Sequence, residues 1–353
     1  MGKHELKQFL RGAYARVLFH TGLHAVVNRM MPRRLTILFG HCVTAEEVNG
    51  FLPPDMKIDG PKLESILRWF GRRYELESIG GGLARLGGAG KRSVVALSMD
   101  DGYRDNRSAL LPILERTGAG ATVFLETRPL DERRVNWSHK FFWLLSRGHA
   151  IDLLARRYQE RTEDAATRES LRKALEEESD LVYRVKRVLK YDADPDDRDR
   201  VLEQLFRDAG GDEEQLCSEL YLTWDDARAL RDAGVELGGH TVSHHILARL
   251  SPERQGEEVG RCAAAMEREL GSSGKVFAYP FGRSWDYDQN SVQAARDAGY
   301  GVAVNTHAGT NDARGGYELR RLPIDNGAEL HLLVAEACGG FDLLRRLGLD
   351  LSA

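Results

Sequence analysis

Short apolar runs alternate with segments of helical periodicity along most of this chain. Runs of strand length cover residues 34–41, 93–100, 121–126, 235–240, 276–280, 301–305 and 319–324. Amphipathic patterns predict helices over 61–74, 106–118, 223–234, 251–270 and 289–299, and Thr223 with Asp226 is placed to form a capping box. Repeated strand–helix units predict a mostly parallel sheet with helices outside it, either open or closed into a barrel.

Residues 128–222 interrupt this alternation. The segment is strongly charged and mostly helical in pattern, and aromatic clusters flank it on both sides. We therefore expect a helical insertion between two strand–helix units. It forms either a solvated lid without a chemical role or a cap over the mouth of a site, and the pattern does not choose between them. The final residues, 331–353, are expected to form a helical tail.

Residues 1–34 have a pattern of their own. Apolar residues recur near helical spacing at Leu6, Phe9, Leu10, Ala13, Val17 and Leu18, among seven lysines and arginines and a single acid. This predicts a basic amphipathic helix, which either lies on an anionic membrane surface or packs on the domain with its basic face in water. A continuous apolar core and an A-x-A cleavage site are missing, so we expect no secretory signal, and no membrane span is expected later.

Composition narrows the class of protein. The 353 residues are 42% hydrophobic, which suffices for a sizeable core, and the net charge of −4 is spread along the chain. Nothing global therefore indicates a nucleic-acid partner. The four cysteines are isolated, which favours reduced thiols over a disulfide framework. We expect a cytoplasmic protein, with contact to the inner membrane face through residues 1–34 as the alternative.

Polar residues occur where the predicted strands end. They are Asp100 and Asp101 at the end of 93–100, His240 and His244 at or just after the end of 235–240, Pro280 and Phe281 at the end of 276–280, and His41 at the end of 34–41. The carboxyl ends of parallel strands share one rim, where chemistry is usually found. Two histidines and one carboxylate form a three-ligand set with an open position, which suits catalytic zinc, although cobalt or nickel can use the same donors. One aspartate would bind the ion, and its neighbour would take a proton from water.

Each of these signals is weak by itself. An Asp-Asp-Gly sequence is often a turn, two histidines four residues apart often lie on a helix surface, and a lone His41 is often a core residue. Their joint position after four separate strands carries the prediction.

The motifs "SMDDG", "HTVSH" and "FAYPFG", in this order, resemble those of NodB-homology polysaccharide deacetylases, carbohydrate esterase family 4. The resemblance covers residues 35–330, with 128–222 as the insertion. It implies a distorted (β/α) barrel and metal-dependent removal of N-acetyl groups from sugars. It also implies that Asp100 is the base and that Asp101, His240 and His244 hold the metal.

Three departures from the family pattern affect the expected site. Ser98-Met99 stands where Thr-Phe is usual, and Ala278 stands where many members have an arginine that orients the base. Arg320 or Arg321 is a candidate replacement for that charge. The usual carboxy-terminal histidine motif is missing, but "ILFGHCV" resembles the amino-terminal version found in the exopolysaccharide-associated branch, which implies that His41 is the general acid.

The third motif supplies the expected substrate contacts, Tyr279, Pro280, Phe281 and Trp285. The resemblance implies that the backbone N–H of Phe281 binds the oxyanion, and the aromatic rings would form an apolar wall for the acetyl methyl or a sugar ring. Core packing is the alternative for Tyr279 and Trp285. Two other functions remain open: deformylation or deacetylation of a lipid-linked sugar at the inner membrane face, and carbohydrate binding without catalysis.

Overall fold

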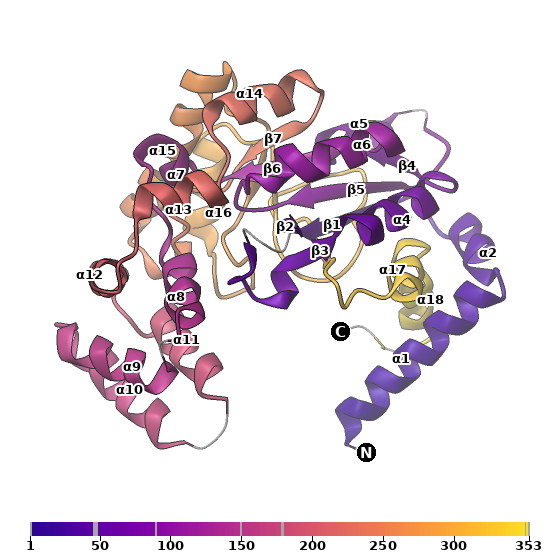
Figure 1. Cartoon of the computed structure of the whole chain (residues 1–353). Helices are drawn as coiled ribbons and strands as arrows, with labels where there is room; N and C mark the ends of the chain where they lie inside the picture. Colours follow the sequence, from indigo (N-terminus) through magenta and orange to yellow (C-terminus); the bar gives the residue numbers. More distant parts are fainter. Residues whose placement is uncertain are drawn as a thin grey trace.

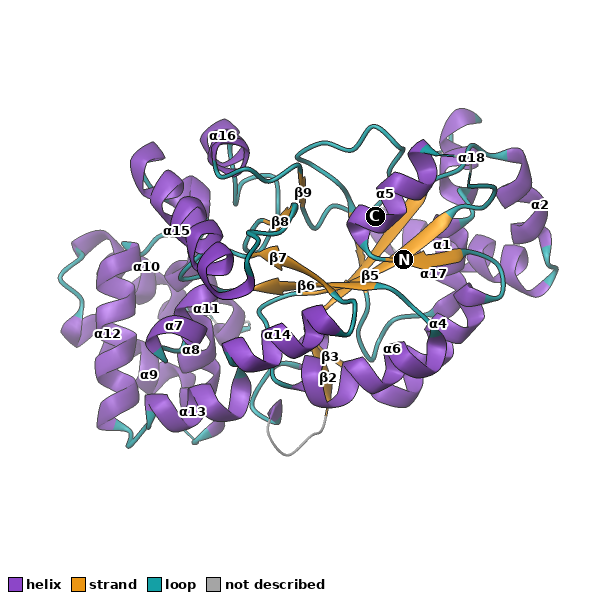
Figure 2. Cartoon of the chain, turned by 90° about the horizontal axis from the view of Figure 1, so that it is seen from above, coloured by secondary structure: helices purple, strands orange, loops and turns teal. Residues whose placement is uncertain are grey.

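A nearly closed parallel sheet forms the centre of the molecule (Figures 1 and 2). The computed structural model describes residues 2–44, 49–88, 90–148, 150–177, 180–349 and 351. The strand order is β10-β1-β5-β6-β7-β8-β9, with β4 paired to β5, and all of these pairs are parallel. A parallel bridge from Val304 to Leu319 brings the β9 edge close to the β10 edge. The sheet is therefore almost a barrel, and the predicted fold class is confirmed.

The strands of the main sheet, except β4, coincide with the predicted apolar runs. The sheet comprises β1 (Leu35–Gly40), β4 (Glu75–Glu77), β5 (Val94–Met99), β6 (Ala121–Leu125), β7 (Glu236–Gly239), β8 (Val276–Ala278), β9 (Val302–Val304) and β10 (Arg321–Pro323). Every residue of β5 and β6 is buried, as expected for parallel strands covered on both faces. A small separate sheet pairs β2 (Cys42–Thr44) with β3 (Lys57–Asp59). The short strands β2, β3 and β4 were not predicted, because a three-residue element has too little periodicity to be recognised.

Amphipathic helices surround the sheet (Figure 2). They are α4 (Gly60–Gly71), α5 (Ile79–Gly87), α6 (Leu111–Thr117), α14 (Trp224–Asp232), α15 (Pro252–Leu270) and α16 (Gln289–Asp297), with a π-helical turn at Asn106–Leu110 and 3-10 turns at Pro54–Met56 and Leu247–Arg249. The predicted capping box is present, since the Thr223 side chain accepts from the Asp226 N–H while the Asp226 carboxylate accepts from the Thr223 N–H. Helix α5 was not predicted, because its sequence IGGGLARLG is rich in glycine.

The chain between β6 and β7 is mostly helical. It forms α7 (Thr127–Glu132), α8 (Trp137–Ser146), α9 (Ile151–Arg161), α10 (Ala165–Glu176), α11 (Leu181–Tyr191), α12 (Pro195–Asp208) and α13 (Glu213–Leu220). Helices α8 to α13 share one apolar core, which also includes Tyr221 after α13 and Tyr103 and Cys42 from the edge of the barrel, whereas Leu130 of α7 packs in the barrel core. In Figure 1 they form an arm beside the sheet. Because its core is continuous with that edge, the arm is packed against the barrel and does not stand apart from it.

The two ends of the chain pack together (Figure 1). Residues 1–34 form two helices, α1 (Lys3–His20) and α2 (Leu23–Met30), where one was predicted. Gly22, at a φ of 77°, ends the first and begins the second, a conformation that glycine adopts without steric cost. Helices α1 and α2 pack on α17 (Leu330–Ala337) and α18 (Gly340–Arg346) through a cluster of small and apolar side chains. Within the described ranges, no helix combines the length and the apolar character needed to cross a membrane.

Candidate active site

The ends of two strands, β5 and β7, bring the predicted metal ligands together. Asp100 and Asp101 follow β5, and the Asp100 N–H donates to the Gly40 carbonyl at the end of β1. His240 follows β7, and its N–H donates to the Leu125 carbonyl of β6. His244 follows four residues later and is oriented by the bond from its N–H to Thr241 Oγ1 (3.0 Å). All four of the named aspartate and histidine side chains are buried.

The side chains of Asp101, His240 and His244 converge on one point. Nε2 of each histidine lies 3.3 Å from Asp101 Oδ1, and one donor atom from each residue lies within 4.8 Å of the others. His240 Nδ1 contacts the Ala278 carbonyl at 2.7 Å, which assigns the proton to Nδ1 and leaves the Nε2 lone pair facing Asp101. Asp101 Oδ1 is buried and has no hydrogen-bond partner among the described residues. This donor set suits a divalent transition metal.

Backbone strain is concentrated at the same place. Among the described residues, six that are not glycine have a positive φ, and four of them surround this cluster: Asp101 (68°), Thr241 (65°), His244 (56°) and Phe281 (61°). Such conformations cost roughly 1–3 kcal/mol each and persist where the surrounding structure imposes them. Their concentration at three loops that meet is typical of a functional site.

Asp100 is held by a buried arginine from another strand. Arg321 on β10 is fully buried, and its Nη1 and Nη2 donate to the two carboxylate oxygens of Asp100 at 2.6 and 2.8 Å. Arg321 Nε donates to the Asn305 carbonyl (2.8 Å), and the guanidinium lies 4.5 Å from the ring centre of Phe39. Of the two arginines that the sequence offered, Arg321 is therefore the one that contacts Asp100, whereas Arg320 is exposed.

The electrostatics keep both carboxylates ionised. Burial by itself would raise the pKa of Asp100, but Arg321 and His240 outweigh it, and the pKa lies below its usual value. Burial likewise opposes ionisation of Asp101, but His244 and His240 hold its pKa well below the usual range. Burial lowers the pKa of His244, despite Asp101, which favours the neutral imidazole that a metal requires.

His41 lies beside the same cluster, between β1 and β2. Its backbone carbonyl accepts from Asn106 Nδ2 (3.2 Å), and its ring packs edge-on near Phe39, with centroids 6.1 Å apart. Its charge acts on Asp100 and Asp101, lowering the pKa of both carboxyls. His41 is half-buried, whereas His240 and His244 are buried, so its side chain is partly accessible to solvent.

The residues of the third motif differ in burial. Tyr279 is fully buried, stacks on Tyr287 with centroids 4.2 Å apart, and donates from its hydroxyl to the Tyr317 carbonyl (3.0 Å). It therefore packs in the core and does not line the site, and Pro280 is buried as well. Phe281 is half-buried, with its ring centroid 4.7 Å from that of His244. Trp285 is 57% exposed, so the core-packing alternative does not hold for it.

A buried polar chain next to Asp101 was missed by the sequence reading. His139 on α8 contacts the hydroxyl of Tyr103 through Nε2 and that of Tyr221 through Nδ1. All three side chains are fully buried, and the Asp101 charge adds to burial in raising the pKa of Tyr103. Residue 139 lies in the insertion, so its distance from Asp101 along the chain hid the contact. The aromatic cluster around "NWSHKFFW" was the one signal that pointed to it.

The His139 environment predicts an acid-sensitive fold. Burial lowers the pKa of His139 to about 3, against about 6.5 in the unfolded chain, so the unfolded state binds the extra proton between these values. Stability is therefore lost as the pH falls through this window. We expect about 2 kcal/mol more loss between pH 7 and pH 5 in the wild type than in His139→Gln, measured by urea unfolding. The exposed control His20→Gln should keep the wild-type slope, and parallel slopes for His139→Gln and wild type would contradict the assignment.

A second contact joins the insertion to the histidine loop. His245 Nε2 lies 3.0 Å from Asp199 Oδ2 on α12, and Arg198 donates to Oδ1 of the same carboxylate at 2.9 and 2.7 Å. The Arg198 guanidinium in turn lies 4.4 Å from the ring centre of Trp137 on α8. His245 was not among the predicted site residues. It ties the loop that carries His244 to the insertion, so the insertion forms a wall of the site.

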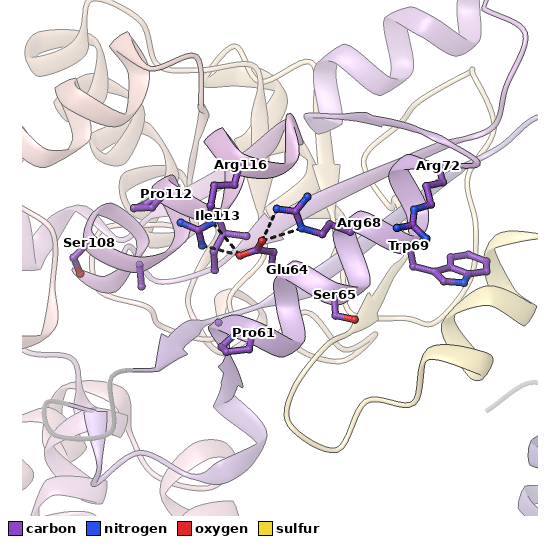
Figure 3. A pocket seen from close by; sticks show the side chains of 12 residues that line it. Pro61, Glu64, Ser65, Arg68, Trp69, Arg72, Ser108, Pro112, Ile113 and Arg116 are labelled. Atoms are coloured by element: carbon purple, nitrogen blue, oxygen red, sulfur yellow. Dashed lines mark hydrogen bonds and ion pairs between the residues drawn. The ribbon is translucent and has the colours of Figure 1, made fainter.

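A surface groove of about 770 Å³ lies away from all of these residues (Figure 3). Helices α4 and α6 line it, and Glu64 at its centre binds both Arg68 and Arg116 at 2.7 Å. Its charges are thus largely paired within the groove, and it holds none of the predicted site residues. The strand ends remain the candidate site.

Comparison with known proteins agrees with this geometry. Residues 201–303 match the family model described as polysaccharide deacetylase, a span that includes His240, His244 and Phe281. "Putative polysaccharide deacetylase YxkH" of Bacillus subtilis (strain 168) is 26% identical over 108 residues, which are 30% of this chain. The match spans 38% of that protein's length.

Solved structures with the same fold cover most of the chain. The Streptococcus pyogenes deacetylase PplD in complex with acetate aligns over 87% of this chain and 99% of its own, with 18% identity and a TM-score of 0.55. A de-N-acetylase from Aggregatibacter actinomycetemcomitans aligns over 84% and 97%, with 17% identity and a TM-score of 0.53. IcaB from Ammonifex degensii aligns over 87% and 97%, with 14% identity and a TM-score of 0.52. The predicted resemblance to polysaccharide deacetylases is confirmed, whereas the permuted histidine motif stays a prediction.

Proposed function

We propose that this chain is a metal-dependent hydrolase that removes N-acetyl groups from the amino sugars of a poly- or oligosaccharide. The convergence of Asp101, His240 and His244 beside a second carboxylate, Asp100, carries the proposal. The buried ion pair of Asp100 with Arg321 argues against a binding protein without catalysis. Arg321 holds the Asp100 carboxylate ionised and in a fixed orientation, as a general base requires, whereas sugar binding alone does not require this. The family match and the fold of the deacetylase structures support the same function.

The ligand residues fit a divalent ion such as zinc. Asp101 Oδ1 is buried without a hydrogen-bond partner among the described residues, and His240 is oriented through Nδ1. An ion held there would lower the pKa of water and polarise the acetamide carbonyl. The proton transfers are assigned to side chains that do not bind the ion.

Asp100 is the proposed base. Its carboxylate is ionised, and Arg321 holds both oxygens in a fixed plane beside Asp101. His41 is the proposed acid that protonates the leaving amine. The Phe281 backbone N–H donates no hydrogen bond within the described chain, and we propose that it stabilises the oxyanion.

Release of acetate tests this function. Full-length protein is incubated with N-acetylglucosamine oligomers before and after removal of metal by a chelator, and again after zinc is added back. We expect acetate with the untreated and the zinc-restored protein, and at least about a hundredfold less with Asp100→Asn, because general-base catalysis contributes about 10²- to 10⁴-fold. Equal acetate release by wild type and Asp100→Asn would remove Asp100 from the mechanism.

A second candidate places the same chemistry on a lipid-linked sugar at a membrane surface. Seven of the thirteen exposed large apolar side chains in the described ranges lie on α1 and α2: Leu6, Phe9, Leu10, Val17, Leu23, Val26 and Met30. The packing of α1 on α17 thus leaves most of the predicted apolar face in solvent, where basic residues accompany it. A basic amphipathic face of this kind suits an anionic lipid surface.

Vesicle co-sedimentation tests the membrane contact. We expect Phe9→Ser/Leu10→Ser/Val17→Ser to pellet at least about fivefold less than wild type with vesicles containing anionic lipid, since each exposed apolar side chain contributes to insertion. The control is Leu153→Ser/Val182→Ser, which removes exposed apolar side chains from the insertion. Equal pelleting of all three proteins would end this candidate. Formate or acetate released from a lipid-linked amide would favour it as the reaction.

A further inference from the structure

Helix α11 of the insertion carries a lysine next to the candidate site. Lys190 Nζ lies 3.8 Å from the ring centre of Phe281, whose ring packs against His244 with centroids 4.7 Å apart. The Lys190 side chain is 12% exposed. A largely buried ammonium and a proposed metal ligand thus contact the same aromatic ring.

A second lysine lies one turn earlier on the same helix. Lys186 is half-buried, and its Nζ lies 4.4 Å from the ring centre of Phe142 on α8. Among the described residues, no carboxylate oxygen lies within 4.0 Å of Lys186 Nζ, although Asp55 attracts it from farther away. Residues i and i+4 share one face of a helix, so both ammonium groups lie on one side of α11.

Within the described residues, only Lys190 of this pair has a carboxylate oxygen within 4.0 Å. Burial lowers the pKa of Lys190 to about 8, although Asp286 Oδ2 lies 3.6 Å from its Nζ. Burial also lowers the pKa of Lys186. A second anion near these groups would restore part of the solvation that burial removes.

An exposed aromatic platform adjoins the lysines. The Trp285 indole N–H donates to the Tyr191 hydroxyl at 2.9 Å, which fixes the orientation of a ring that is 57% exposed. The guanidinium of Arg283 lies 5.6 Å from the centre of the same ring. A ring that is oriented by a hydrogen bond and largely exposed suits stacking on a sugar.

We propose that Lys186, Lys190, Tyr191 and Trp285 form a subsite for a negatively charged sugar unit next to the sugar that is deacetylated. The charge recognised is a carboxylate, as on a uronic acid, or a phosphate on the glycan. The inference rests on the proposed function for the identity of the neighbouring sugar. The alternative is that Lys190 only forms a structural ion pair with Asp286. That alternative predicts no selectivity for acidic glycans.

Binding of matched oligosaccharides to the full-length protein tests the subsite without requiring turnover. The probes are a neutral N-acetylglucosamine oligomer, an oligomer that alternates N-acetylglucosamine with glucuronic acid, and an N-acetylglucosamine oligomer that carries 6-phosphate. Affinity is measured by calorimetry, and acetate release is recorded in parallel. The carboxylate and phosphate probes separate the two sources of charge.

The variants separate recognition from structure. Within the described residues Lys186→Gln breaks no ion pair, so it is the first test, whereas Lys190→Gln removes the ammonium that pairs with the buried Asp286 carboxylate. Lys190→Arg keeps the charge and should keep acidic binding. Lys173→Gln removes an exposed lysine from α10, elsewhere on the insertion, and is the control for net charge.

We expect wild type to bind one acidic probe about ten- to a hundredfold more tightly than the neutral probe, and Lys186→Gln to lose most of that preference. Equal binding of neutral and acidic probes by wild type overturns the subsite, as does a preference that survives Lys186→Gln together with Lys190→Gln. Acetate release without acidic preference overturns the subsite and leaves the hydrolase intact. A preference for the acidic probe without acetate release would support the subsite and contradict the proposed hydrolase function.

Discussion

We expect replacement of Asp101 by alanine to abolish stoichiometric binding of a divalent ion and to lower acetate release by about a thousandfold or more. The variant removes the one carboxylate of the three-residue cluster, whose Oδ1 lies 3.3 Å from Nε2 of both His240 and His244. The remaining two imidazoles are too few for a stable catalytic zinc site, which uses three protein ligands. Loss of the metal would remove several kcal/mol of transition-state stabilisation, and about 4 kcal/mol corresponds to a thousandfold lower rate.

Elemental analysis after dialysis against trace zinc measures the bound ion, and acetate release is measured on the same samples. The control is His331→Gln, which removes a histidine on α17 that lies outside the cluster. It should retain one ion per chain and the wild-type rate. One tightly bound ion in Asp101→Ala would show that the proposed ligand set is wrong.

We expect replacement of Arg321 by methionine to destabilise the fold by about 3–5 kcal/mol. The substitution leaves the Asp100 carboxylate buried and without its bidentate partner, and uncompensated buried charges have costs of this size. The double variant Asp100→Asn/Arg321→Met removes both charges and should recover most of the lost stability. Because neither variant retains an oriented base, both should remain inactive.

Urea unfolding at pH 7 measures both free energies. Arg320→Met is the matched control, since Arg320 is the neighbouring residue on the same segment and its side chain is exposed. It should change stability by less than about 0.5 kcal/mol, as surface substitutions usually do. If the double variant were as unstable as Arg321→Met alone, the cost would come from lost packing against Phe39 and not from the charge of Asp100.

The sequence was sufficient for the order of the main strands and of most of the helices that surround them. Each main strand is a short apolar run, and each surrounding helix has a periodic apolar face, so the signal lies within about ten neighbouring residues. The same reasoning placed Asp100, Asp101, His240 and His244 at one rim, because the carboxyl ends of parallel strands meet there. Their convergence in the structure follows from the parallel pairing of β5, β6 and β7.

Tertiary packing alone decided the features whose partners lie far apart along the chain. The pairing of β1 with both β5 and β10 brings Arg321 to Asp100, and nothing local distinguishes Arg321 from Arg320. The fold of the insertion brings His139 to Tyr103, and the packing of α1 on α17 leaves Phe9 exposed. Local patterns report which face of an element is apolar. Which surface covers that face, and which charge is buried beside another, depends on contacts across the whole fold.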